Sequence, residues 1–280
     1  MSNAITVTSQ PEVGPTLEFG TDEQQTEEAE IYLDGTLVLI GCGKEKRDPG
    51  DPTDLHVAAV GPDEEFRNGT GPAWEAQNLY THWYFRAKAD FAEIVSSWAN
   101  DVEGGPPGWA ILSAEHGILY PWEKVRHYDT TIEDLGGDES NPDHHVRNPY
   151  CRRRPDGREI VTERDLWATN VAYKLASWQA DFRDQPGPFA ADRANTLLVL
   201  AGEKYIDPLR ERGVFEYGIS KMVAGANGPL LPVKRTRFLF EELDAGGNGE
   251  QGSWLHDATD RVESHLSPDS GEQATLSGVR

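Results

Sequence analysis

Three short runs of apolar residues stand out along the chain, and each is followed by a glycine or by small and polar residues. They occupy residues 36–40, 109–113 and 196–201. Each run is continuously apolar rather than alternating, which is typical of a parallel strand buried on both faces. We therefore expect these runs to be strands of one parallel sheet.

Between these runs, apolar residues recur every three or four positions, as they do on one face of a helix. The first such pattern comprises Leu79, Trp83, Ala87, Phe91, Ile94 and Trp98, and the second comprises Trp167, Val171, Leu175, Trp178 and Phe182. Thr162 and Asp165 have the spacing of a capping pair before the second helix. Residues 232–243, with a proline near their start, predict a last core helix.

Strands that alternate with helices predict an α/β protein, here a three-layer α/β/α sandwich around a mainly parallel sheet. We expect a single domain over residues 31–243, with surface insertions near 48–77 and 136–163. Residues 1–30 are polar and acidic, so a disordered leader is expected. Residues 244–280 predict a flexible linker and tail, in which the spacing of Trp254, Leu255, Ala258, Val262 and Leu266 favours a short helix.

The chain is strongly acidic, with 48 Asp and Glu against 26 Lys and Arg and a net charge of −22. Such a surface, with few lysines, is typical of proteins from a cytoplasm at molar salt, as in halophilic archaea; an ordinary acidic protein is the alternative. At about 1 M salt the Debye length is roughly 3 Å, so like charges scarcely repel. The charge disfavours broad electrostatic binding to DNA, but it permits a local nucleic-acid site that works by shape and stacking.

Several classes of protein are not expected. No run of about 18 apolar residues is present, so no membrane span is predicted, and residues 1–10 do not resemble a secretory signal. We therefore expect a cytoplasmic protein. Cys42 and Cys151 are too few for a disulfide scaffold. His144 and His145 lack a third ligand at usable spacing, so no metal and no other cofactor is predicted.

Ligands of open parallel sheets bind at the carboxyl ends of the strands, so the residues after each predicted strand are candidates for a site. The first strand is followed by Gly41, Cys42, Gly43, Lys44 and Lys46. The second ends with Ser113, followed by His116, Gly117, Tyr128 and Asp129. The third is followed by Gly202, Glu203 and Tyr205. Small residues, cations, carboxylates and rings thus follow three strands.

Most of these residues also have a structural interpretation. The glycines and lysines after the first strand suit an approaching anion, or only a tight turn with solvated lysines. Cys42 is a nucleophile if a base lies beside it, but a packed thiol is favoured. His116 with Glu115 forms an acid/base pair, or His116 caps a turn. Asp129 orients a water molecule, or forms an Asx turn or helix cap.

Two further groups have the same ambiguity. Glu203 contacts a sugar hydroxyl, or it only begins a helix. The arginines at 152–154 contact phosphates, or they pair with acidic side chains, which is the interpretation we favour.

As an ordered series, these motifs resemble an uncharacterised family, a domain of unknown function. Its members show Ser-Cys-Gly-Lys-x-Lys after a strand, then L-S-A-x-H-G-L-L, then Y-D-x-T and L-A-G-x-x-Y. The matching residues here are 42–46, 109–121, 128–132 and 200–205, together with a helix motif at 78–85, and the resemblance spans about residues 37–243. Gly41 stands where the family has serine, so no side-chain hydroxyl is present there.

A more distant resemblance concerns Ser113, Gly117, Leu119, Pro121 and Tyr128. Their order is similar to that in the peroxide-stress protein YaaA and in the glycosylase-like domain of archaeosine tRNA-modifying enzymes. The second resemblance implies a fold like that of uracil-DNA glycosylase.

Three functions are compatible with these features. The first is an N-glycosidase-like enzyme acting on a nucleobase, a nucleoside or a nucleic acid, with an oxocarbenium-like transition state. In that enzyme Asp129 orients water or stabilises charge, and His116 and Lys44 serve the leaving base or a phosphate. Tyr128 or Tyr205 stacks on the base. The second is a non-catalytic protein of the YaaA stress type that binds a nucleotide or a single-stranded nucleic acid. The third is an accessory protein of a mobile element, recognised through its tails.

Overall fold

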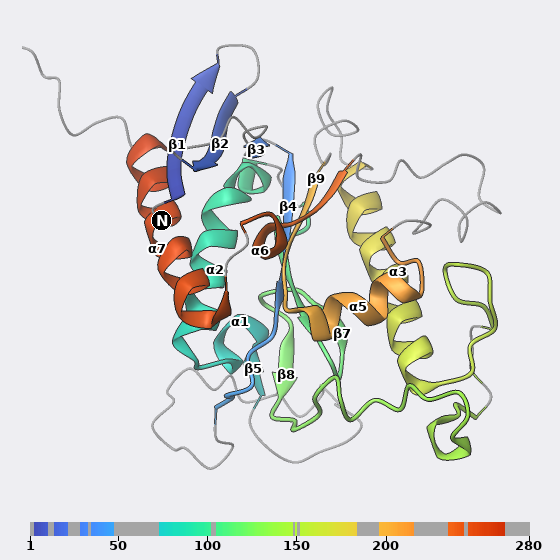
Figure 1. The fold of residues 1–280 in the computed structure, drawn as a ribbon. Coiled ribbons are helices and arrows are strands. Elements are labelled where there is room, and N and C mark those ends of the chain that lie inside the picture. Colours follow the sequence, from blue (N-terminus) through green and yellow to red (C-terminus); the bar gives the residue numbers. More distant parts are fainter. Residues whose placement is uncertain are drawn as a thin grey trace, which may run out of the picture.

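The computed structural model of the chain describes residues 3–10, 14–21, 29–32, 35–47, 73–101, 105–147, 149, 152–183, 196–215, 235–243 and 246–266. A five-stranded sheet lies at its centre, in the order β10-β9-β4-β6-β7 (Figure 1). Its strands are β4 (Thr36–Gly41), β6 (Trp109–Ser113), β7 (Gly117–Leu119), β9 (Thr196–Leu200) and β10 (Arg235–Phe238). All neighbours are parallel except β7, which is antiparallel to β6. The expected α/β class, with a mainly parallel sheet, is confirmed.

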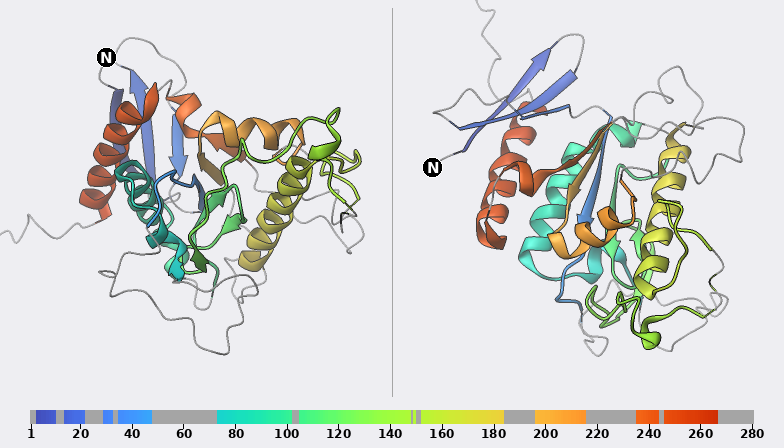
Figure 2. Two further views of the ribbon diagram at one scale, coloured as in Figure 1. Left: turned by 90° about the horizontal axis from the view of Figure 1, so that it is seen from below. Right: turned by 45° about the vertical axis from the view of Figure 1, so that its right-hand side comes forward.

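Helices cover both faces of this sheet, as Figures 1 and 2 show. On one face lies α2 (Trp83–Val95), against which α7 (Gly247–Leu266) packs. On the other face lie α3 (Glu163–Arg183) and α5 (Glu203–Glu211). Alternate residues of each central strand belong to the two cores, which is why the strand runs are continuously apolar.

The start of α3 follows the predicted capping pattern. The amide of Asp165 donates to Thr162 Oγ1 at 3.2 Å, and the amide of Thr162 donates to Asp165 Oδ2 at 3.0 Å. Each side chain thus satisfies a backbone amide at the first turn, where amides lack partners within the helix.

The helix predicted for residues 232–243 is wrong at residues 235–238 and correct at residues 239–242. Residues 235–238 form β10, paired with β9 from Arg235 opposite Thr196 to Phe238 opposite Val199. Only the short α6 (Leu239–Glu242) is helical, and residues 232–234 lie outside the described residues. Residues 235–238 form a strand because they pair with β9 and so extend the central sheet. This tertiary pairing outweighs the local preference for a helix.

The termini also differ from expectation. Within residues 1–30, where no regular structure was predicted, β1 (Asn3–Gln10), β2 (Gly14–Thr21) and β3 (Ala29–Tyr32) form an antiparallel sheet. The register sets Ile5 opposite Phe19, and the alternating apolar residues of both strands were the overlooked signal. At the other end, α7 begins at Gly247, inside the expected linker, and is longer than the helix predicted from Trp254 onward.

The remaining described elements are small. Strand β5 (Ala73–Glu75) pairs antiparallel with β8 (Lys124–Arg126), and α1 (Ala76–Leu79) follows β5. Two short 3₁₀ helices occupy Ser97–Asp101 and Pro142–His144. Most of the expected insertion at 48–77 lies outside the described residues. No helix within the described ranges is long and apolar enough to cross a membrane.

Candidate functional site

The three strands whose ends carry the candidate residues are neighbours in the sheet, with β4 between β9 and β6. Parallel strands end at the same edge, so residues that follow them are close in space. Five polar side chains gather there, and we call them the carboxyl-edge cluster: Cys42, Tyr80, Ser113, Tyr128 and Tyr205.

Hydrogen bonds link the members of the carboxyl-edge cluster. The hydroxyl of Tyr128 lies 2.6 Å from that of Tyr80 and 2.9 Å from Ser113 Oγ. The sulfur of Cys42 lies 3.0 Å from the Tyr205 hydroxyl. Tyr80 and Ser113 are fully buried, whereas Cys42 and Tyr128 are half-buried, so the network runs from the core to the surface.

The backbone at Ser113 is held in place from two sides. The indole of Trp167, on α3, donates to the Ser113 carbonyl at 2.9 Å, and the amide of His116 donates to Ser113 Oγ at 3.1 Å. Gly117 closes the turn between β6 and β7 with a φ of 71°, in the left-handed region that favours glycine. Ser113 and Gly117 therefore shape this turn whether or not a ligand binds.

The glycine after β4 also has a structural reason. A Cβ at Gly41 would lie 3.1 Å from the Cβ of Ala201, so the close approach of β4 to the segment after β9 favours glycine there. This packing gives Gly41 a structural role that does not depend on a ligand. Gly43 and Lys44 follow it in the loop, and Lys44 is exposed.

One further lysine contacts the cluster, and another lies beside it. The ammonium of Lys46 lies 4.3 Å from the centroid of the Tyr128 ring, within range of a cation–π interaction. Lys88, on α2, is buried and donates to the carbonyl of Gly41 at 2.5 Å. Lys88 was not among the residues predicted for the site, although a lysine between the apolar positions Tyr84 and Phe91 of one helix face is itself a signal.

The environment keeps the tyrosines of the cluster protonated. Burial, followed by the nearby Cys42, raises the pKa of Tyr80, Tyr128 and Tyr205 above the ordinary value. Burial also lowers the pKa of Lys88 to about 8, against the opposing influence of Cys42. At neutral pH the carboxyl-edge cluster thus offers hydroxyl donors beside ammonium groups.

His116 lies at the surface with its ring edge-on to Tyr128, at a centroid distance of 5.1 Å. Partial burial lowers the pKa of this imidazole, and the charges of Glu115 and Glu123 oppose the shift. A neutral imidazole can accept or donate a hydrogen bond. Glu115 is bound by the hydroxyl of Thr130, so the predicted pairing of Glu115 with His116 is not the contact made here.

Asp129 was predicted as the catalytic carboxylate, and its side chain does not enter the cluster. It is 95% exposed and lies 3.6 Å from His127 Nε2. The third strand end contributes Glu203 at the exposed first turn of α5, after Gly202 as its N-cap. Gly202 and Glu203 line a separate cavity of about 710 Å³ together with Phe238.

In the basic segment at 152–154, the buried residue Arg154 forms ion pairs with acidic side chains. Arg154 is 4% exposed and contacts Asp156 at 2.5 Å and Asp165 at 3.2 Å. Arg212 also reaches Asp165, at 2.7 Å. For Arg154, the favoured interpretation of acid pairing is confirmed.

His144 and His145 are used within their own loop. His144 accepts from the amide of Asp138 at 3.1 Å, and His145 Nε2 lies 2.9 Å from the carbonyl of Glu139. Within the described residues, no three histidine, cysteine or acidic side chains are grouped so that they could hold a metal ion.

Comparison with known proteins gives one family. Residues 70–218, just over half of the chain, match the model of a family of unknown function (DUF6884). No curated protein and no solved structure matches the chain. The matched range contains β6, β7, α3 and β9, and with them every member of the carboxyl-edge cluster except Cys42.

Proposed function

The chain belongs to the family of unknown function DUF6884, and we propose that it binds a nucleotide at the carboxyl-edge cluster. The observation that carries the proposal is the hydroxyl network of Tyr80, Tyr128 and Ser113, with Lys46 over the Tyr128 ring. Neutral hydroxyls beside ammonium groups suit an anion such as a phosphate, and the edge of a parallel sheet is where such ligands bind.

The distribution of charge supports an anionic ligand. The chain has a net charge of −22 and eight lysines, and three of these, Lys44, Lys46 and Lys88, lie around this one edge. In a surface that otherwise repels anions, cations placed at a strand end favour a specific anion site. The proposed identity of the ligand also rests on the resemblance to YaaA and to glycosylase-like domains, and we extend the proposal to a uracil-DNA-glycosylase-like architecture.

The network contains no carboxylate, and this favours binding over cleavage of a glycosidic bond. An oxocarbenium-like transition state needs a nearby negative charge. The hydrogen bonds of the cluster join hydroxyls and a thiol, whereas the carboxylate of Asp129 points to solvent. The site is therefore better suited to holding a nucleotide than to cleaving it.

N-glycosidic cleavage is the second candidate, because the pair of His127 and Asp129 flanks Tyr128 in the chain. Chromatography of nucleosides and nucleotides incubated with the protein at molar KCl distinguishes the two candidates. Release of free base that Asp129→Asn abolishes supports the enzyme, and intact ligand supports the binding protein.

Calorimetric titration with adenosine 5′-monophosphate (AMP) at molar KCl tests the proposal. Removing the ammonium next to Tyr128 with Lys46→Met should weaken binding at least about tenfold, equivalent to about 1.4 kcal/mol. Lys124→Met is the matched control, since Lys124 lies on β8 and pairs with Glu75 at 3.3 Å rather than with a member of the cluster. Equal affinities of wild type and Lys46→Met, or no binding by wild type, would contradict the proposal.

A further inference from the structure

The cavity of about 710 Å³ that Gly202, Glu203 and Phe238 line lies where β9 and β10 end, and we call it the β10 cavity. Its described lining residues include no member of the carboxyl-edge cluster. The starts of α5 and α7 and the short α6 complete its wall. Ligand pockets commonly have volumes of about 300–1,000 Å³, and ligands of parallel sheets bind at the carboxyl ends of the strands. The β10 cavity thus has the size and the place of a ligand site.

The charged side chains of the β10 cavity leave one carboxylate without a partner. Lys204 is paired with Glu133, and Glu241 is paired with Arg210 at 2.7 Å. The carboxylate of Glu203 makes no hydrogen bond or ion pair with any residue that the structure describes. Because the nearby cations are already balanced, an anionic ligand would meet uncompensated negative charge here.

The first turn of α5 places hydrogen-bond donors beside this carboxylate. Gly202 is the N-cap of α5 and has no side chain to bond the first amides, which have no partner within the helix. The positive end of the helix dipole also disfavours a cationic ligand at this place. A hydroxyl group both donates and accepts a hydrogen bond, so it matches a carboxylate and backbone amides at once. The charges therefore favour a neutral ligand that carries hydroxyl groups.

The apolar part of the wall includes two phenylalanine rings. The guanidinium carbon of Arg210 lies 3.8 Å from the centroid of the Phe238 ring, and Phe215 meets that ring edge-on at 5.2 Å. Phe240 is half-buried, and the Tyr84 ring lies tilted to it at 6.2 Å, so Phe240 is the less enclosed of the two. A sugar ring has C–H groups on its faces and hydroxyls at its edge. It can therefore pack on an aromatic ring while its hydroxyls bond to polar groups.

From these features we infer that the β10 cavity binds a neutral sugar the size of a monosaccharide. Hydroxyls of the sugar donate to the carboxylate of Glu203 and accept from the first amides of α5, and an apolar face of the ring packs on Phe240. The inference concerns a second site. It does not depend on the nucleotide proposed for the carboxyl-edge cluster, because no cluster member lines the cavity.

Saturation-transfer NMR at molar KCl tests the inference with D-glucose, D-galactose and D-mannose. Each is compared with its protonated amino sugar and with its uronate, which are charged rings of nearly the same size. At least one neutral sugar should bind, and at least about tenfold more tightly than its two charged counterparts.

Two variants alter the proposed contacts. Glu203→Gln keeps the size of the side chain but removes its charge, and it should weaken sugar binding at least about tenfold. Phe240→Leu removes the flat ring but keeps an apolar side chain, and it should weaken binding severalfold. Because Glu203 is exposed, the melting temperature of Glu203→Gln should change little.

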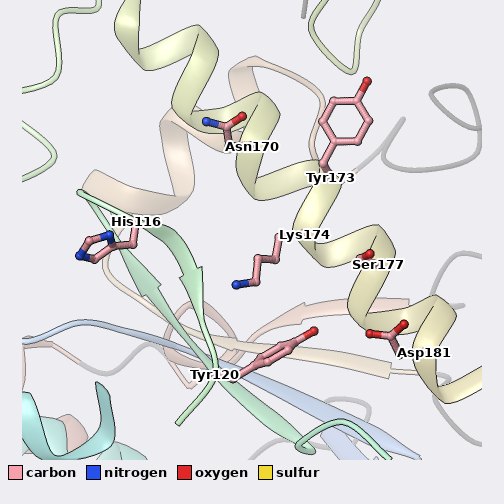
Figure 3. A pocket seen from close by; sticks show the side chains of 7 residues that line it. All are labelled: His116, Tyr120, Asn170, Tyr173, Lys174, Ser177 and Asp181. Carbon is pink, nitrogen blue, oxygen red and sulfur yellow. The ribbon is translucent and has the colours of Figure 1, made fainter. Parts of the chain in front are cut away.

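Asp181→Asn is the matched control, because it removes one carboxylate from the wall of a different hollow. Asp181 lines a groove of about 590 Å³ along α3, and Figure 3 shows it at the opposite end of that groove from His116. Asp181→Asn should bind the sugar as wild type does.

Several results would overturn the inference. These are the absence of saturation transfer to all three neutral sugars, wild-type affinity in Glu203→Gln or in Phe240→Leu, and equal weakening in Asp181→Asn. Tighter binding of a uronate or of a protonated amino sugar would also overturn it, since the cavity would then select a charged ligand.

Discussion

At the scale of single residues, Lys88 is the most unusual group near the site. It is buried beneath the carboxyl edge, and the hydrogen bonds and ring contacts around it come from the Gly41 carbonyl and the Tyr84 ring, at 2.5 and 4.9 Å. Neither partner carries a full negative charge. The buried ammonium is therefore poorly compensated, which is what lowers its pKa to about 8.

This depressed pKa predicts how stability depends on pH. Below pH 8, Lys88 is protonated in both states, and the cost of burying its charge is fully present. Between pH 8 and the unfolded value of 10.5, the folded state releases the proton first, so the free energy of unfolding rises with pH. Relative to Lys88→Met, wild type should gain roughly 3 kcal/mol across this window. Urea unfolding of both proteins at fixed molar KCl measures it, and parallel pH profiles would refute it.

Residues of the site differ in how far the sequence could predict them. Ser113 and Tyr205 could be predicted because a parallel sheet brings its strand ends to one edge. The direction of Asp129 could not, since it lies in an irregular segment where the local backbone decides which way a side chain points.

At the scale of elements, α3 is anchored by a buried ion network at its first turn. Asp165 is fully buried and accepts from the guanidinium groups of Arg154 and Arg212. Burial opposes ionisation, but the amides of Thr162 and Val161 and the charge of Arg212 lower the pKa of Asp165 below its ordinary value. Arg154 of this basic segment thus helps to hold the start of α3.

Removing the central carboxylate of this network should be costly. Asp165→Ala leaves two nearly buried guanidinium groups without their shared partner, and a loss of about 3–5 kcal/mol in the free energy of unfolding is expected. Thr162→Ala, which removes only the cap hydroxyl, should cost about 1 kcal/mol. Denaturant unfolding followed by circular dichroism compares them, and similar small losses for both variants would show that the network contributes little.

The strands also show where the pattern of apolar residues in the sequence is enough to predict secondary structure. The three apolar runs predicted β4, β6 and β9 to within a residue, because both faces of each strand are buried. The pattern failed for β10, where pairing with β9 decides the structure of residues 235–238. It also failed at the N-terminus, where Ile5 and Val7 alternate with polar residues, as is typical of a strand, but the polar and acidic composition predicted disorder.

At the scale of the whole molecule, the net charge of −22 is the feature that most affects how stability depends on salt. The carboxylates of the surface repel one another, and the repulsion is strongest in the compact folded state. We predict that the melting temperature rises steeply from dilute buffer to molar KCl, as salt screens this repulsion. Calorimetric scans across that range, with an equally concentrated uncharged osmolyte as the control, measure the effect. A flat melting temperature would contradict the proposal of a halophilic protein.

The central claim is that a nucleotide binds where β4, β6 and β9 end, and a crystal structure determined with saturating AMP tests it most directly. The account predicts ligand density in contact with the ammonium of Lys46 and the hydroxyl of Tyr128. An unoccupied carboxyl-edge cluster under these conditions, or AMP bound only elsewhere on the molecule, would contradict it.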